Sequence, residues 1–173
     1  MVVTLHNERP TVDELVRRTA ATLDGEGYEL LLVDDGSTDG TWEEIERLHG
    51  SDGHLRGVRL KRNFGQHPAM HAGLVRARGD ILVTMDGDLQ NDPRDIEQFL
   101  TKIEEGYDIV VGWRFNRQDK LVSRKIPSRI ANWLIGRVTG VRLHDYGCTL
   151  KAYRAEIVRE TRIYGEMHRF LPA

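Results

Sequence analysis

Short apolar runs alternate with amphipathic stretches along the first 111 residues, and this alternation constrains the fold more than any other feature of the chain. Five of the runs are too short to be buried helices and predict strands, at residues 2–5, 29–33, 55–60, 80–84 and 108–111. Strand–helix–strand units of about thirty residues are joined by right-handed crossovers. The sequence therefore predicts an α/β, Rossmann-like fold, with a mostly parallel, doubly wound sheet and helices on both faces.

Local signals mark where the helices begin and end. Capping-box spacing predicts helix starts at Thr11, with Glu14, and at Thr41, with Glu44. A third start is predicted at Asp92, a cap residue that stands directly before Pro93. Glycines predict the helix ends, at Gly50, Gly79 and Gly106. Beyond Gly112 we expect a basic loop over 113–125, a helix over 127–138, a strand over 148–153 and a helix from Ala155.

Composition narrows the class of protein. With 173 residues, 39% of them hydrophobic, the chain suits one domain, 1–173, and is too apolar for a disordered segment. No apolar run approaches the roughly twenty residues of a membrane-spanning helix, and the N-terminus lacks the layout of a secretory signal. Cys148 is the only cysteine, which excludes an internal disulfide and a multi-cysteine zinc site. We expect it to be a small core residue.

The formal charge of −2 hides two parts of opposite sign. Residues 1–111 hold 12 Lys and Arg against 22 Asp and Glu, whereas residues 112–173 hold 13 against 5. The basic side chains gather after the fifth predicted strand, at Arg114, Arg117, Lys120, Arg124, Lys125 and Arg129. Arginine forks match phosphate oxygens, so this segment suits a diphosphate, and a solvated basic surface is the plainer alternative. Nucleic acid has little support, because no recognisable binding motif accompanies the segment.

Three polar clusters follow predicted strands, and in an open parallel sheet ligands gather beyond the carboxyl ends of the strands. The clusters are His6-Asn7-Glu8, Asp34-Asp35-Gly36-Ser37 and Asp86-Gly87-Asp88-Leu89-Gln90. In the second cluster a carboxylate could accept hydrogen bonds from a nucleobase, although Asp, Gly and Ser are also ordinary turn residues.

The third cluster has the composition of a divalent-cation site. Asp86 and Asp88 are separated by one small residue, so both carboxylates can approach one cation from a tight turn, and Gly87 allows backbone to come close to a ligand. Mg²⁺ and Mn²⁺ favour oxygen ligands and keep positions open for substrate phosphates. The amide oxygen of Gln90 is a further candidate ligand. A solvated acidic turn is the plainer interpretation.

Other families with acidic sites fit the spacing poorly. A response-regulator receiver carries its acidic pair after the first strand and its phosphoacceptor Asp after the third, where this chain reads LKRN. A haloacid-dehalogenase-type phosphatase has its Asp-x-Asp after the first strand, whereas here it follows the fourth. His67 and His71 have a zinc-compatible spacing, but the glutamate of a metalloprotease helix is missing between them.

Taken together and in order, the clusters resemble the family-2 glycosyltransferases of the GT-A nucleotide-diphospho-sugar fold, and most of all the polyprenyl-phosphate type. The segments that carry the resemblance are LLVDDGSTDGTWEEI from Leu31, RNFGQHPAMHAGL from Arg62, GDILVTMDGDLQNDP from Gly79, VVGWRFNR from Val110 and HDYGCTLKAYR from His144. Each segment alone is a weak signal, but five in order over nearly the whole chain are a strong one.

The resemblance implies a division of the domain and a set of roles. Residues 1–111 would be the nucleotide-sugar and metal-binding part, and residues 112–173 the acceptor-side basic part. The implied donor-binding residues are Glu8, Asp34 and Asp35 at the nucleoside, Asp86, Gly87, Asp88 and Gln90 at a Mg²⁺ or Mn²⁺ ion and the diphosphate, and Arg114 at the donor phosphates. Asp88 is also implied in catalysis.

On the acceptor side the resemblance implies polyprenyl phosphate, with Arg124 and Ser128 near the lipid phosphate and Asp145 as a catalytic acidic residue close to the sugar. The implied reaction is an inverting transfer from a GDP- or UDP-sugar. Two alternatives stay open: a sugar or protein hydroxyl acceptor with Asp145 as base, or an inactive nucleotide-sugar-binding domain truncated at its C-terminus.

The resemblance also implies a location at the cytoplasmic face of a membrane, in cell-envelope glycan synthesis. The basic part would then face an anionic membrane surface, where each exposed Lys or Arg is worth about 1 kcal/mol. The sequence carries no indication of an oligomeric state.

Overall fold

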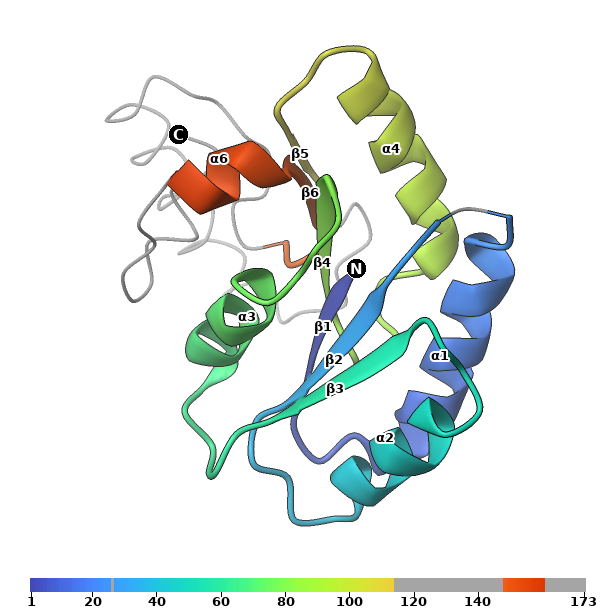
Figure 1. The fold of residues 1–173 in the computed structure, drawn as a ribbon, viewed down its shortest axis with the longest axis vertical. Coiled ribbons are helices and arrows are strands. Elements are labelled where there is room, and N and C mark those ends of the chain that lie inside the picture. Colours follow the sequence, from blue (N-terminus) through green and yellow to red (C-terminus); the bar gives the residue numbers. More distant parts are fainter. Residues whose placement is uncertain (26, 114–147, 161–173) are drawn as a thin grey trace, which may run out of the picture.

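Six strands form one sheet in the part of the chain that the computed structural model describes, which is residues 1–25, 27–113 and 148–160. The strands are β1 (Val2–Leu5), β2 (Leu30–Asp34), β3 (Leu55–Arg59), β4 (Ile81–Asp86), β5 (Ile109–Val111) and β6 (Lys151–Arg154). Their order across the sheet is β3-β2-β1-β4-β6-β5 (Figure 1). β1 to β4 pair in parallel, and β6 runs antiparallel to both of its neighbours. The predicted mostly parallel sheet is confirmed.

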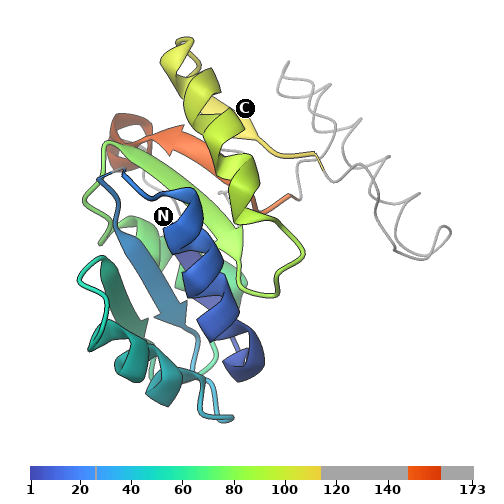
Figure 2. The same cartoon turned by 90° about the vertical axis from the view of Figure 1, so that its right-hand side faces the viewer.

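Helices cover both faces of this sheet, as predicted. They are α1 (Arg9–Thr22), α2 (Thr41–His49), α3 (Gln66–Leu74), the 3₁₀ turn η1 (Pro93–Asp95), α4 (Ile96–Glu104) and α6 (Ala155–Glu160). Side chains from α1, α2 and α4 pack on one face and those from α3 and α6 on the other. Figure 2 looks onto the face that carries α1 and α4.

Alternation along β2 shows how the strands supply both layers of the core. Leu30 and Leu32 face the α1, α2 and α4 layer, whereas Leu31 and Val33 face α3 and α6. All four side chains are at most 1% exposed. Strands buried on both faces read as continuous apolar runs, which is why the sequence pattern locates them well. Cys148 is 2% exposed and belongs to the same core, as expected.

Two predicted helix starts are wrong at the level of the capping residue. α1 begins at Arg9, ahead of Thr11, whose hydroxyl donates to the backbone oxygen of Glu8 instead (2.8 Å). α2 begins at Thr41 itself, and the carboxylate of Asp39 accepts the Thr41 backbone N–H (3.0 Å). In both cases the residue with capping-box spacing lies inside the first turn, and the carboxylate of Asp39 accepts the backbone N–H of the first residue of each helix, Arg9 and Thr41.

The remaining boundary signals are confirmed with one exception. Asp92 caps η1 by accepting from the backbone N–H of Arg94 (3.0 Å). Gly50 follows α2 directly, and Gly106 lies two residues beyond the end of α4 with the left-handed backbone of a helix end (φ 104°). Gly79 does not end a helix, because α3 stops at Leu74 and the chain leaves it through a separate turn.

The basic part is described only at its edges. The strand predicted over 148–153 is β6, and the helix predicted from Ala155 is α6. The predicted helix over 127–138 and all of the predicted loop over 113–125 except Trp113 lie outside the described residues. In the described part, no helix combines the length and the apolar character that a bilayer crossing needs.

Candidate functional site

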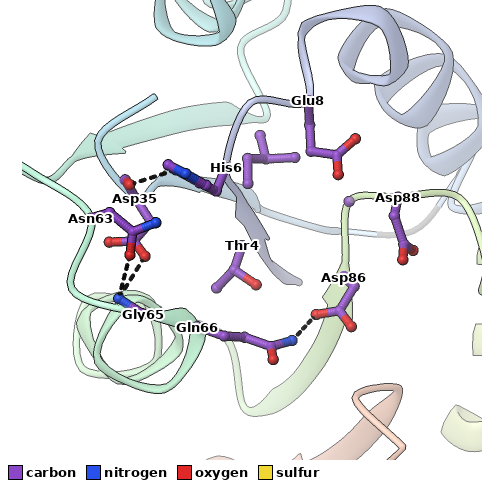
Figure 3. Close-up of a pocket in the computed structure, with 11 residues that line it drawn as sticks. Thr4, His6, Glu8, Asp35, Asn63, Gly65, Gln66, Asp86 and Asp88 are labelled. Atoms are coloured by element: carbon purple, nitrogen blue, oxygen red, sulfur yellow. Dashed lines mark hydrogen bonds between the residues drawn. The ribbon is translucent and has the colours of Figure 1, made fainter. Parts of the chain in front are cut away.

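A cavity of about 330 Å³ opens at the carboxyl edge of the sheet, where β1, β2 and β4 end and the β3–α3 loop approaches them (Figure 3). Its lining combines four carboxylates with amide, hydroxyl and glycine groups. The lining residues are Thr4, Leu5, His6, Glu8, Asp35, Asn63, Gly65, Gln66, Asp86, Gly87 and Asp88. No Lys or Arg belongs to this lining, so the described part of the cavity attracts cations.

The loop after β1 is tied to the loop after β2. The imidazole Nδ1 of His6 donates to the backbone oxygen of Asp35 (3.0 Å). Asn7, in the left-handed region (φ 57°), donates its backbone N–H to Ser37 and accepts from Thr38, each at 2.9 Å. The Glu8 carboxylate lies in the cavity wall. Its Oε2 is 3.1 Å from the Thr11 hydroxyl, whose single hydrogen it shares with the backbone oxygen of Glu8.

The two aspartates after β2 have different surroundings. Asp34 is fully buried and does not line the cavity, since its Oδ1 accepts from the Ser37 backbone (3.1 Å) beneath the loop. Its Oδ2 accepts no hydrogen bond in the described part and lies 3.8 Å from Nε of Arg59. Asp35 does line the cavity. The sheet therefore separates two carboxylates that are adjacent in the sequence.

Asp35 holds the β3–α3 loop. Its two carboxylate oxygens accept the backbone N–H groups of Phe64 (2.8 Å) and Gly65 (2.9 Å). Gly65 has a positive φ of 95°, so the chain turns there directly into α3. Asp35 thereby places Asn63 and Gln66 in the cavity wall (Figure 3).

Asn63, Gly65 and Gln66 are site residues that the sequence reasoning missed. A signal was present, because β3 is parallel to β2 and its carboxyl end lies at the same edge of the sheet as the acidic clusters. The expectation that ligand groups follow strand ends applies to β3 as much as to its neighbours. Thr4, which also lines the cavity, had no comparable signal, because it lies inside β1.

The third cluster reaches the cavity through the end of β4. Asp86 is the last residue of that strand, and its Oδ1 accepts from Nε2 of Gln66 while its Oδ2 accepts from Oγ1 of Thr149 (2.8 Å). Asp88 accepts the backbone N–H of Gln90 (3.1 Å). Gln90 itself is exposed and is not part of the lining.

Gly87 permits the close packing of this turn. A Cβ built at position 87 would lie 2.1 Å from Cδ2 of Leu5 and 3.3 Å from the backbone oxygen of Thr4. The backbone N–H of Gly87 donates to that same oxygen (3.2 Å), so the turn after β4 is seated on the end of β1. A side chain at 87 would therefore force either the Leu5 side chain or the turn itself to shift.

The donor set fits a divalent cation that also takes ligands from a substrate. The described residues contain no group of three or more His, Cys, Asp or Glu side chains arranged to hold a metal by themselves. Mg²⁺ and Mn²⁺ are commonly bound through one or two carboxylates plus waters and substrate phosphates. Asp86 and Asp88 supply such a pair of hard oxygen donors in one cavity wall.

Several predicted site residues fall in the part of the chain without a description. Arg114, Arg124, Ser128 and Asp145 all lie outside the described residues, as do the other basic residues of 117–129. On either side of that segment, the backbone N–H of Gly112 donates to the backbone oxygen of Leu150 (2.9 Å). Thr149, which contacts Asp86, is next to Leu150, so β6 returns to the cavity edge.

Comparison with known proteins places this geometry in a family. The family described as "Glycosyl transferase family 2" matches residues 1–162. A dodecaprenyl-phosphate galacturonate synthase of Rhizobium johnstonii is 54% identical over 177 residues, which cover 100% of this chain and 52% of the relative. An undecaprenyl-phosphate 4-deoxy-4-formamido-L-arabinose transferase of Shewanella sediminis is 43% identical over 175 residues, covering 99% and 53%. The chain thus spans about half the length of these relatives.

A solved structure supports the fold independently of close sequence similarity. Glucosyl-3-phosphoglycerate synthase from Mycobacterium tuberculosis, in complex with Mn²⁺, UDP and glucosyl-3-phosphoglycerate, superposes with a TM-score of 0.70 at 21% identity. The match covers 90% of this chain and 56% of that protein.

Proposed function

The chain belongs to glycosyl transferase family 2 and has the GT-A fold, and we propose that it transfers a sugar from a nucleotide-diphosphate donor to polyprenyl phosphate with inversion at the anomeric carbon. The observation that carries the acceptor class is the match of nearly the whole chain to two relatives that are named for different sugars but both for polyprenyl phosphate. The chain spans about half the length of each relative, so we propose rather than infer from similarity alone that it carries out the complete sugar transfer.

The acidic cavity is the proposed donor site. Asp86 and Asp88 would hold Mg²⁺ or Mn²⁺, and the cation would neutralise charge on the departing diphosphate. Gln90, the third ligand suggested by the sequence, is exposed and lies outside the cavity lining, so the proposal does not depend on it. A cavity lined by four carboxylates repels a bare diphosphate, so a cation is the simplest way to make the site accept one. The Mn²⁺ and UDP held by the mycobacterial synthase are consistent with this arrangement and favour UDP as the first donor nucleotide to test.

The remaining donor contacts belong to the neighbouring strand ends. Glu8 and Asp35 would face the nucleoside, and Asp34 would support them from beneath the loop that it holds through Ser37. Gly87 would let the backbone approach the diphosphate. Arg114, from the segment outside the described residues, would meet the donor phosphates.

The chemistry requires little proton transfer. An oxygen of the lipid phosphate attacks C1 of the sugar, the bond from C1 to the diphosphate oxygen breaks, and its electron pair leaves on the nucleoside diphosphate. The attacking oxygen is already ionised at neutral pH, so Asp145 would orient the acceptor or sugar rather than remove a proton. Arg124 and Ser128 would hold the lipid phosphate. A lipid acceptor would bring the reaction to a membrane surface, which we propose to be the cytoplasmic face.

Calorimetric titration with UDP and with GDP, each with and without Mn²⁺, tests the donor half of the proposal. We expect one nucleotide to bind, and to bind only when the cation is present. If neither nucleotide binds with Mn²⁺, the donor site is wrong. A transfer assay with short polyprenyl phosphate, read by product mass, then identifies the acceptor and the sugar.

Asp88→Asn tests the metal assignment. The substitution keeps the shape of the side chain and removes the negative charge, so transfer should fall by about a hundredfold or more while the circular dichroism spectrum stays unchanged. Asp95→Asn, on η1 outside the cavity lining, is the matched control and should keep native activity. Full activity of Asp88→Asn would remove Asp88 from the metal site.

Asp145→Asn separates the two acceptor classes. A phosphate acceptor needs no strong base, so transfer should fall by about tenfold or less. A loss of several orders of magnitude would instead indicate a hydroxyl acceptor that depends on Asp145 as base.

A further inference from the structure

The carboxylate of Asp86 is held from two sides by residues far away in the sequence. Nε2 of Gln66, the first residue of α3, donates to Oδ1, and Oγ1 of Thr149 donates to Oδ2 at 2.8 Å. Thr149 is 63 positions from Asp86, so this contact exists only because β6 returns beside β4. Gln66 is exposed, whereas Thr149 is partly buried at the edge of the sheet.

Thr149 is itself fixed in place. Its backbone oxygen accepts from the hydroxyl of Thr84 on β4 (2.8 Å), and Thr84 is only 2% exposed. Its Oγ1 also accepts a long hydrogen bond from Nδ2 of Asn91 (3.5 Å). A hydroxyl has one hydrogen to donate, and here that hydrogen is directed at the Asp86 carboxylate.

Asp88 differs from Asp86 in how it is oriented. Its Oδ1 accepts from the backbone N–H of Gln90, only two residues along the same turn. Among the residues that the structure describes, its orientation is therefore set within the turn itself. Asp86, by contrast, accepts hydrogen bonds from α3 and from Thr149, two residues ahead of β6, so residues outside the turn help to orient it.

We propose that Thr149 is a positioning residue that aims the Asp86 carboxylate at the divalent cation and so sets the affinity of the site for that cation. This inference rests on the proposed metal-assisted donor binding. Residues that orient a metal ligand commonly change metal affinity by about 10- to 100-fold when they are replaced.

The test measures UDP binding by calorimetry over a series of Mn²⁺ concentrations, using the whole chain. Thr149→Val replaces the hydroxyl with a methyl group of similar size. Thr149→Ala removes both the hydroxyl and the methyl group of threonine. Both should raise the Mn²⁺ concentration for half-maximal UDP binding by about 10- to 100-fold. Thr149→Ser keeps the hydroxyl and should stay within about threefold of the native value.

A second readout separates positioning from general damage. At saturating Mn²⁺, UDP affinity of the Val and Ala variants should return to within about threefold of native, whereas a distorted cavity would bind UDP poorly at every Mn²⁺ concentration. Thr101→Val is the matched control, because the Thr101 hydroxyl donates to the backbone oxygen of Glu97 on α4 and Thr101 does not line the cavity. It should leave both measurements unchanged.

The outcomes distinguish this inference from the function on which it rests. If the native chain binds UDP without any dependence on Mn²⁺, the proposed cation site fails. If native binding depends on Mn²⁺ but the Val and Ala variants need no more of it than the native chain does, the cation site stands and the role of Thr149 is overturned. Poor UDP binding by the Val and Ala variants at saturating Mn²⁺ would also overturn the positioning role of Thr149.

Discussion

At the scale of single residues, Asp35 shows a carboxylate that serves the site through the backbone. It is 3% exposed, and both of its oxygens accept N–H groups of the β3–α3 loop. A carboxylate can accept two such bonds because it has no hydrogen of its own at neutral pH. The loop residues Asn63 and Gln66 reach the cavity through this arrangement.

Asp35→Asn should therefore destabilise the fold as well as weaken donor binding. The amide nitrogen of Asn cannot accept a hydrogen bond. Either the Phe64 N–H loses its acceptor at residue 35, at a cost of about 1–3 kcal/mol, or the Gly65 N–H keeps only its bond to Oδ1 of Asn63 (2.9 Å), at a smaller cost. Urea unfolding measures the loss, and Asp24→Asn, at an exposed position after α1, is the control. Unchanged stability would show that the loop does not depend on these two bonds.

Tyr153 makes stability sensitive to alkaline pH. Burial raises the pKa of its phenol above the usual value of 10.0, although a hydrogen bond with Thr84 partly offsets this. The unfolded chain then ionises at lower pH than the folded chain, so the contribution of Tyr153 to stability is complete below pH 10 and is lost as the pH rises above it.

Tyr153→Phe removes the group that titrates. Between pH 9 and pH 11 the native protein should lose more free energy of unfolding than the Phe variant does, as measured by urea unfolding. Tyr107→Phe, at a side chain that is 57% exposed, should behave like the native protein. An equal loss in all three proteins would contradict the assignment of the alkaline step to Tyr153.

At the scale of elements, α3 lies very close to the sheet. A Cβ at Gly73 would come 2.3 Å from Cγ1 of Val2 and 2.9 Å from Cγ2 of Val33. Both valines are fully buried on β1 and β2. The absence of a side chain at Gly73 therefore sets the spacing between α3 and the strands, and α3 begins at Gln66 in the cavity wall.

Gly73→Ala tests that spacing. Alanine would favour the helix by about 1 kcal/mol, but overpacking a buried contact usually costs about 1–3 kcal/mol, so we expect a net loss of stability together with weaker nucleotide binding. Urea unfolding and UDP titration measure the two effects. Gly53→Ala, where a Cβ would meet nothing within 4 Å, is the control. A stabilised Gly73→Ala protein would mean that α3 moves freely on the sheet.

At the scale of the whole molecule, charge is unevenly distributed along the chain. The part that builds most of the sheet and the acidic cavity, 1–111, carries the excess of carboxylates, and residues 112–173 carry the excess of Lys and Arg. The described cavity lining has only acidic charges. A nucleotide and a lipid phosphate are both anions, so each would need either a cation or the basic part to be bound.

The basic part leads us to expect binding to anionic membranes. The chain should sediment with vesicles that contain phosphatidylglycerol at low salt, and the bound fraction should fall as salt shortens the screening length from about 14 Å at 50 mM to about 6 Å at 300 mM. Vesicles of phosphatidylcholine alone are the control and should bind little. Equal binding to both kinds of vesicle would contradict an electrostatic membrane contact.

The sequence predicted the elements well because their signals are local. Strands buried on both faces appear as apolar runs, and their ends agree with the structure to within a few residues. Helix caps were predicted less well, since Asp39 rather than Thr41 satisfies the start of α2. Several acceptable capping residues lie close together there, and spacing alone does not choose between them.

By itself, the sequence determined the order of strands and helices, and hence which polar clusters reach the carboxyl edge of a parallel sheet. Glu8, Asp35, Asp86 and Asp88 come together in one cavity as that rule requires. Only the tertiary structure decided that Asp34 lies beneath the site and that Asp35 holds the β3–α3 loop. It also decided that Thr149 contacts Asp86. The physical reason is that apolar periodicity reports how one segment meets the core, whereas contacts between distant segments depend on strand order, register and side-chain packing.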